Sequence, residues 1–142
     1  MEAGRELDAL IADKVMGMAP CDAWRPWNMG SAGGPMVAIS YEDGRCKNGH
    51  ERGKCYSVVM NGPAGGCPKY STDIAVAWSV VEKLNENGWY VWVFSHGAHY
   101  GCWMERFDVN KDDTVSERRI PACEADTAPL AISLAALKAA GA

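Results

Sequence analysis

Residues 89–95 form the segment that most limits the folds open to this chain. Their sequence, Trp-Tyr-Val-Trp-Val-Phe-Ser, is rich in the aromatic and β-branched residues that favour a strand. Apolar side chains occupy both sets of alternating positions, so both faces of this strand are expected to be covered. Coverage on both faces predicts a sheet that lies between two layers of helices.

Residues 70–84 form the clearest helix in the sequence. Ser71 or Thr72 is expected to cap its N-terminus, and Asp73 suits the positive end of the helix dipole. Gly88 is a natural stop because glycine readily adopts the left-handed conformation after the last turn. The apolar residues at helical spacing predict the buried face: Ile74, Ala77, Trp78, Val81 and Leu84.

Two more helices and several strands complete the expected order α–β–β–α–β–β–β–α. Residues 2–16 predict a first helix, and a last helix is expected to begin after Thr127 and to end at Gly141. Residues 18–35 are rich in proline and glycine and are expected to be loop. The remaining strands are expected at 36–41, 56–60, 102–109 and 114–120, with the first two of these paired together and those from residue 89 onward in an antiparallel meander.

This order indicates one α+β domain over residues 1–142. We expect an α/β/α sandwich with a mainly antiparallel sheet, three helices and about five strands. A glycine-rich basic region at about 42–69 is expected to form an exposed loop, because it is polar and too long for a tight hairpin.

Three stretches carry a family resemblance. The sequence Tyr-Ser-Thr-Asp-Ile-Ala-x-Ala-Trp-x-Val-Val-Glu-Lys-Leu at 70–84 resembles the signature of the phage ABA sandwich domain family. Residues 5–17 are similar to the opening helix of that family, and residues 127–139 to its closing helix. The resemblance implies an α/β/α sandwich encoded by a phage or prophage, and it implies no particular reaction.

Composition and charge limit the cellular location and the classes of partner that we expect for this protein. The formal net charge is −4 and the pI is near 5.3, which argues against a double-stranded nucleic acid partner. No apolar run approaches the length that spans a membrane, and the N-terminus has the pattern of a charged amphipathic helix. We therefore expect a cytoplasmic protein, in the host cell if the phage resemblance holds, with its six cysteines reduced.

Four potential metal ligands occur within one glycine-rich stretch: Cys46, His50, Cys55 and Cys67. Thiolate and imidazole groups suit a structural zinc ion. However, Cys46 and Cys55 are too far apart for a zinc knuckle, and no Cys-x-x-Cys pair occurs. Zinc is therefore one reading of these residues, and plain buried or exposed thiols are the other.

A ligand site is predicted where aromatic and basic residues converge. Two tryptophans in the 18–35 loop offer stacking platforms, although they would equally serve to cover a sheet edge. From residue 45 to residue 69 there are five Lys or Arg and one acid, Glu51, which suits an anionic ligand or an acidic partner, or else a solvated loop. The candidate ligand-binding residues are Trp24, Arg25, Trp27, Arg45, Lys69, Tyr70, Ser71, Thr72, His96 and His99.

No catalytic constellation stands out, so the sequence favours a non-enzymatic binding protein. It lacks a Gly-x-Ser-x-Gly elbow and an evident pair of carboxylates. We expect either sequestration of a nucleotide-like host defence signal or docking on a host or phage protein. A nucleotide hydrolase is the enzymatic alternative. A free strand edge makes a homodimer or a higher oligomer a further expectation.

Overall fold

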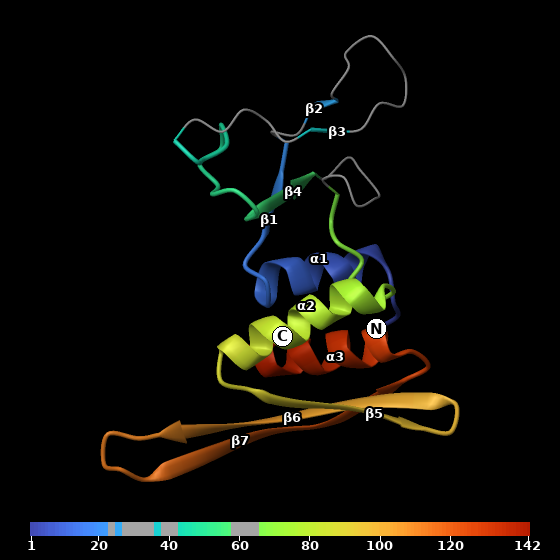
Figure 1. Cartoon of the computed structure of the whole chain (residues 1–142), viewed down its shortest axis with the longest axis vertical. Helices are drawn as coiled ribbons and strands as arrows, with labels where there is room; N and C mark the ends of the chain where they lie inside the picture. The colour runs from blue at the N-terminus through green and yellow to red at the C-terminus, as the bar shows by residue number, and fades with distance from the viewer. Residues whose placement is uncertain (23–24, 27–35, 38–42, 58–65) are drawn as a thin grey trace. The chain divides into compact units, whose positions relative to one another are not determined.

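The computed structural model describes residues 1–22, 25–26, 36–37, 43–57 and 66–142 (Figure 1). The chain divides into two compact units. Unit 1 comprises residues 1–16 and 69–142, and unit 2 comprises residues 17–68. The glycine-rich basic region predicted from the sequence falls within unit 2, apart from Lys69.

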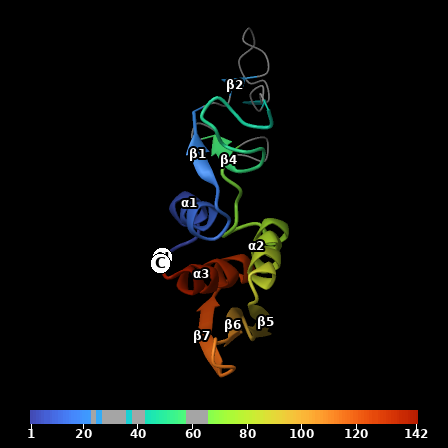
Figure 2. The ribbon, with the colours of Figure 1, turned by 90° about the vertical axis from the view of Figure 1, so that its left-hand side faces the viewer.

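Unit 1 is a three-stranded antiparallel sheet with three helices on one side. The helices are α1 (Arg5–Lys14), α2 (Ile74–Glu86) and α3 (Ala128–Ala140), of which α2 and α3 contact the strands and α1 packs on α3. The strands are β5 (Tyr90–His96), β6 (His99–Val109) and β7 (Val115–Ala125), in the order β5-β6-β7. The α+β class, the three helices and the meander from residue 89 onward are confirmed. Figures 1 and 2 show the three helices on one side of this sheet.

Helix α3 is the centre of unit 1. It contacts α1, α2 and all three strands. Thr127 caps its N-terminus by accepting a hydrogen bond from the Leu130 backbone N–H, and Gly141 ends it in the left-handed conformation, both as predicted. Its small side chains Ala131, Ala135 and Ala136 are fully buried. Small residues let the neighbouring helices and the sheet approach the α3 backbone closely.

Helix α2 differs from the sequence prediction in its cap and in its buried face. Asp73, and not Ser71 or Thr72, is the N-cap, because its carboxylate accepts hydrogen bonds from the backbone N–H groups of residues 75 and 76. Ile74 is 52% exposed and Trp78 is 50% exposed. The stripe that is buried is Ala77, Val80, Val81 and Leu84, which has the same helical spacing and places Ile74 and Trp78 at its flank.

Buried polar contacts join the start of α1 to the segment that precedes α2. The Ser71 backbone N–H donates to Asp8 Oδ1 at 2.7 Å, and the Gly4 backbone N–H donates to Ser71 Oγ at 2.9 Å. Ser71 is fully buried and Asp8 is 5% exposed. Ser71 therefore serves the packing of unit 1.

Unit 2 contains four short strands: β1 (Ala19–Cys21), β2 (Arg25–Pro26), β3 (Met36–Val37) and β4 (Cys55–Ser57). Strand β1 pairs in parallel with β4, and β2 pairs antiparallel with β3. The predicted loop at 18–35 and the predicted pairing of 36–41 with 56–60 are therefore wrong where these ranges are described. Proline suggested a loop, but short edge strands tolerate it, as β1 does at Pro20.

The sheet of unit 1 is covered on one face. Met104 and Cys102 of the central strand are fully buried on the helix side, whereas Tyr90, Trp92 and Phe94 on β5 are 59%, 39% and 39% exposed. The expectation that residues 89–95 are covered on both faces is therefore wrong for the described part of the chain. Among those residues, no helix is both long enough and apolar enough to cross a bilayer.

The Asp8 contact gives a test of the core of unit 1. Replacing Asp8 with Ala leaves the buried Ser71 N–H without its acceptor, so we expect a loss of about 1–3 kcal/mol in the free energy of unfolding. Urea denaturation measures this loss. Asp13→Ala removes a carboxylate of the same helix that is 57% exposed, and it should leave stability nearly unchanged. Equal stability of the two variants would contradict the structural role of Asp8.

Candidate functional site

The open face of the β5–β6–β7 sheet gathers five aromatic side chains. Strand register places Tyr90 opposite Glu105, Trp92 opposite Trp103 and Phe94 opposite Gly101, so these pairs share one side of the sheet. Phe107 lies on the same side because side chains alternate along β6. We call this set the aromatic face: Tyr90, Trp92, Phe94, Trp103 and Phe107.

The rings of the aromatic face pack on one another. Trp92 and Trp103 stack with centroids 4.1 Å apart and an interplanar angle of 4°, and Tyr90 meets Phe107 edge-on at 6.2 Å. The Phe94 ring lies over Gly101. A Cβ atom at Gly101 would collide with the Phe94 ring, so glycine allows the ring to rest on the strand. Ring–ring contacts of this kind restrict the conformations of these side chains.

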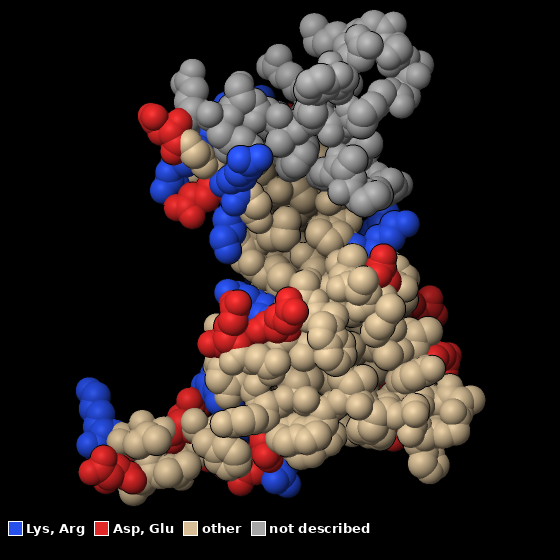
Figure 3. Space-filling model, viewed as in Figure 1, with Lys and Arg blue, Asp and Glu red and all other residues tan. Residues whose placement is uncertain are grey.

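The charges on this face are already paired within the chain. The Arg119 guanidinium lies 5.8 Å from the Trp103 ring and bonds to Glu105 at 3.3 Å and to Glu117 at 2.9 Å. Charged side chains are also visible at the β6–β7 turn, which contains Lys111, Asp112 and Asp113 (Figure 3). The aromatic face is therefore an apolar surface beside which one arginine is paired with two glutamates.

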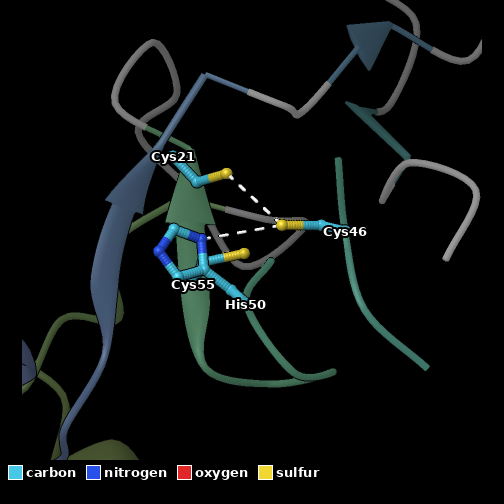
Figure 4. Close-up of side chains that lie close together, drawn as sticks. All are labelled: Cys21, Cys46, His50 and Cys55. Atoms are coloured by element: carbon cyan, nitrogen blue, oxygen red, sulfur yellow. Dashed lines mark hydrogen bonds between the residues drawn. The ribbon is translucent and has the colours of Figure 1, made fainter. Parts of the chain in front are cut away.

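Unit 2 brings together four side chains with metal-binding chemistry. The ligand atoms of Cys21, Cys46, His50 and Cys55 all lie within 4.8 Å of one another (Figure 4). The distance from Cys21 Sγ to Cys46 Sγ is 3.9 Å, and from Cys46 Sγ to His50 Nδ1 it is 3.6 Å. The three cysteines are buried and the histidine is half-buried. We call this set the Cys/His cluster.

The surroundings of the cluster give two of its thiols, Cys46 and Cys55, different pKa values. Burial favours the neutral form of the Cys46 thiol. Hydrogen bonds have the larger combined effect and lower the pKa of Cys46 to about 7; they come from the backbone N–H groups of Asn48 and His50, from the His50 side chain and from Cys21. Burial and the nearby Cys21 and Cys46 raise the pKa of Cys55 to about 11. Closely placed thiols resist simultaneous ionisation unless a cation joins them.

The other two buried cysteines face each other in the sheet. Cys102 on β6 and Cys123 on β7 are register partners, and both are free thiols. Burial, with a smaller effect of Cys123, raises the pKa of Cys102 to about 12. A thiol with so high a pKa is inert at neutral pH, so this pair is part of the core.

The structure assembles the predicted metal ligands only in part. Cys46, His50 and Cys55 lie together as expected, and Cys21 completes the set, whereas Cys67 is outside it. Cys21 was missed because it lies in the stretch interpreted as loop. The parallel pairing of β1 with β4 sets Ala19 opposite Cys55, which brings Cys21, two residues along, to the same side of this ladder.

The predicted ligand-binding residues are divided between the two units. Tyr70 and Ser71 are buried in unit 1, while Lys69 and Thr72 are exposed. Arg45 donates to the Gly49 carbonyl oxygen and to Glu51. The two turn histidines are both exposed, and His99 Nδ1 lies 3.2 Å from Asp126 Oδ1. Trp24 and Trp27 lie outside the described residues, and of Arg25 only the backbone, in β2, is described.

Comparison with known proteins places the chain in one family. Residues 9–137 match the family model described as the phage ABA sandwich domain, which is nearly the whole chain. Searches of curated proteins and of solved structures gave no match. The resemblance at 70–84 and at the two terminal helices is thereby confirmed, and this chain belongs to the phage ABA sandwich domain family.

Proposed function

We propose that this protein is a non-enzymatic protein–protein interaction module that docks through its aromatic face, with a second copy of the chain as the occupant. The observation that carries this proposal is the set of five aromatic side chains on an uncovered sheet face. Tyrosine, tryptophan and phenylalanine are the residues enriched in interface cores. Large exposed apolar patches on proteins mark interaction sites.

The size of the surface suits a protein partner. Four of its rings are between 39% and 59% exposed, so their open area together is on the order of 350 Å², taking about 200 Å² for each aromatic side chain. That is roughly two-thirds of the apolar area on one side of a standard interface of about 800 Å². Val109 and Val115, 71% and 62% exposed, extend the same face along β6 and β7.

The charge arrangement is compatible with a second copy, because ion pairs within each chain leave little excess charge on the face. In a two-fold dimer the same patch meets itself, so any unpaired charge on it would face its own kind. Arg119 pairs with both Glu105 and Glu117 within each chain, so this group carries one excess negative charge and not two. Two sheets can then stack through their aromatic side chains at about 10 Å, which is the usual spacing of packed sheets.

Charge substitutions on exposed rings test this proposal. Tyr90→Asp combined with Phe107→Asp places unpaired carboxylates in the interface, while both positions remain exposed in the single chain. We expect the dimer dissociation constant to rise by at least about 30-fold, the value of one interface hot spot of about 2 kcal/mol. Sedimentation velocity over a concentration series measures the constant.

The matched control is Ile74→Asp. This residue is 52% exposed, lies in the first turn of α2 outside the aromatic face, and occupies a position where the helix dipole favours a carboxylate. The control should dimerise like the wild type. A wild-type chain that stays monomeric at its highest attainable concentration would refute the second copy as occupant.

We propose as a second candidate the binding of a nucleotide-like host signal by the basic surface of unit 2. The specific observation is that Arg45, Lys47, Arg52 and Lys54 are all exposed within one short segment whose only acid is Glu51. Such a surface attracts phosphates. A phage gains from sequestering a host defence nucleotide without catalysis, and membership of a phage family gives this reasoning its context.

A binding assay separates this candidate from a merely solvated segment. We expect Lys47→Ala with Arg52→Ala to weaken the binding of a signalling nucleotide by at least about tenfold, since each lost charge-assisted hydrogen bond is worth about 1.5–3 kcal/mol. Lys111→Ala, an exposed lysine in the β6–β7 turn, is the control. Isothermal titration with a panel of cyclic and linear nucleotides provides the measurement, and an absence of heat with every member would exclude this function.

A further inference from the structure

We propose that Cys21, Cys46, His50 and Cys55 bind one structural zinc ion that holds unit 2 together. The four residues come from separate parts of the unit: the end of β1, the turn at 45–50 and the start of β4. Three thiolates and one imidazole are a standard ligand set for tetrahedral zinc.

Two of the observed separations match the edges of a zinc tetrahedron, and all the ligand atoms lie within 4.8 Å of one another. Zn–S bonds of about 2.3 Å and Zn–N bonds of about 2.0–2.1 Å give a sulfur–sulfur edge of about 3.8 Å and a sulfur–nitrogen edge of about 3.6 Å. The corresponding distances here are 3.9 Å between Cys21 and Cys46, and 3.6 Å between Cys46 and His50. A disulfide needs sulfurs about 2.05 Å apart, so Cys21 and Cys46 are not bonded to each other, and their spacing leaves room for a metal ion between them.

Polar groups around the cluster are arranged to support thiolates. The Asn48 side-chain amide donates to Cys21 Sγ at 3.3 Å and is itself oriented by Asp22 Oδ1 at 2.6 Å. Backbone N–H groups of Asn48 and His50 point to Cys46. The turn that holds Cys46 and His50 is closed by backbone hydrogen bonds between these two residues and from Gly49. Such outer hydrogen bonds fix the ligands and tune a metal site.

A zinc ion bound by the cluster would also account for the basic residues near its ligands. Zinc with three thiolates and a neutral imidazole carries a net charge of −1. Four basic residues, at positions 45, 47, 52 and 54, surround the ligands in sequence, against the two acids Glu51 and Asp22. The positive segment therefore offsets the negative centre.

A full set of four protein ligands leaves no open position for water, so the ion is structural and not catalytic. Unit 2 has 52 residues, and its described strands are two or three residues long. Units of this size usually need a staple because they bury too little apolar surface. Zinc joining β1, β4 and the 45–50 turn supplies one.

The decisive experiment compares two cysteine substitutions in the full chain. Wild-type protein and Cys67→Ser, whose thiol lies outside the cluster, should each carry one zinc per chain by elemental analysis. Cys21→Ser should weaken zinc binding by more than the roughly 10- to 100-fold loss caused by removing an outer-shell partner. Circular dichroism of the helices of unit 1 checks that the remainder of each variant is folded.

Cobalt provides a second measurement that does not depend on the substitutions. Titration of Co²⁺ into metal-free, reduced wild-type protein should produce the absorption bands of a tetrahedral thiolate site at one equivalent. Wild-type protein that carries no zinc and gives no such bands would overturn the proposal. Loss of zinc in Cys67→Ser, whether or not Cys21→Ser also loses it, would overturn this ligand set.

Discussion

The packing of small side chains along α3 is the constraint on which unit 1 depends. Ala131, Ala135 and Ala136 are fully buried and present almost no side-chain volume. The α1 and α2 helices and the sheet can therefore all approach the same helix. A larger residue at these positions would force them apart, and overpacking of this kind costs about 1–3 kcal/mol. The buried stripe of α2 and the helix-side residues of β6 owe their burial to this approach.

Gathering all three helices on one side of the sheet leaves the other side open. The side chains of the aromatic face lie on that open side. The stacked tryptophans and the edge-on Tyr90–Phe107 pair make it a fixed, largely apolar surface. Docking through a preorganised surface loses less side-chain entropy than docking through mobile side chains. Function by surface recognition is compatible with the proposed zinc site, because four protein ligands would leave that ion no open position for catalysis.

The sequence predicts unit 1 correctly where a single local signal, such as a helix cap or a turn, determines the structure. Thr127 and Gly141 bound α3 as expected, and the alternation of turns and apolar runs after residue 89 predicts the meander. The prediction was wrong at Ile74 and Trp78, because two stripes of α2 have the same helical spacing and only the tertiary contacts choose between them. The prediction that both faces of β5 are covered by this chain was also wrong. An apolar side chain in the sequence is compatible with burial by the same chain or by a partner.

The candidate sites were less accessible to sequence reasoning. Cys46, His50 and Cys55 are close in sequence and could be grouped by composition, but Cys21 joins them only through the parallel pairing of β1 with β4. Parallel pairing between short, distant strands leaves no local pattern. The aromatic face likewise arises from the register of β5 with β6, which sets Trp92 opposite Trp103. Local patterns specify elements, whereas the Cys/His cluster depends on the pairing of distant strands and the aromatic face on the register between consecutive strands.

Native mass spectrometry of the full chain, purified under reducing conditions, tests the central claim that this is a binding protein assembled through its aromatic face. The account predicts a species with the mass of two chains and two zinc ions, which dissociates into single chains that each retain one zinc. A single-chain mass at every concentration would contradict the assembly.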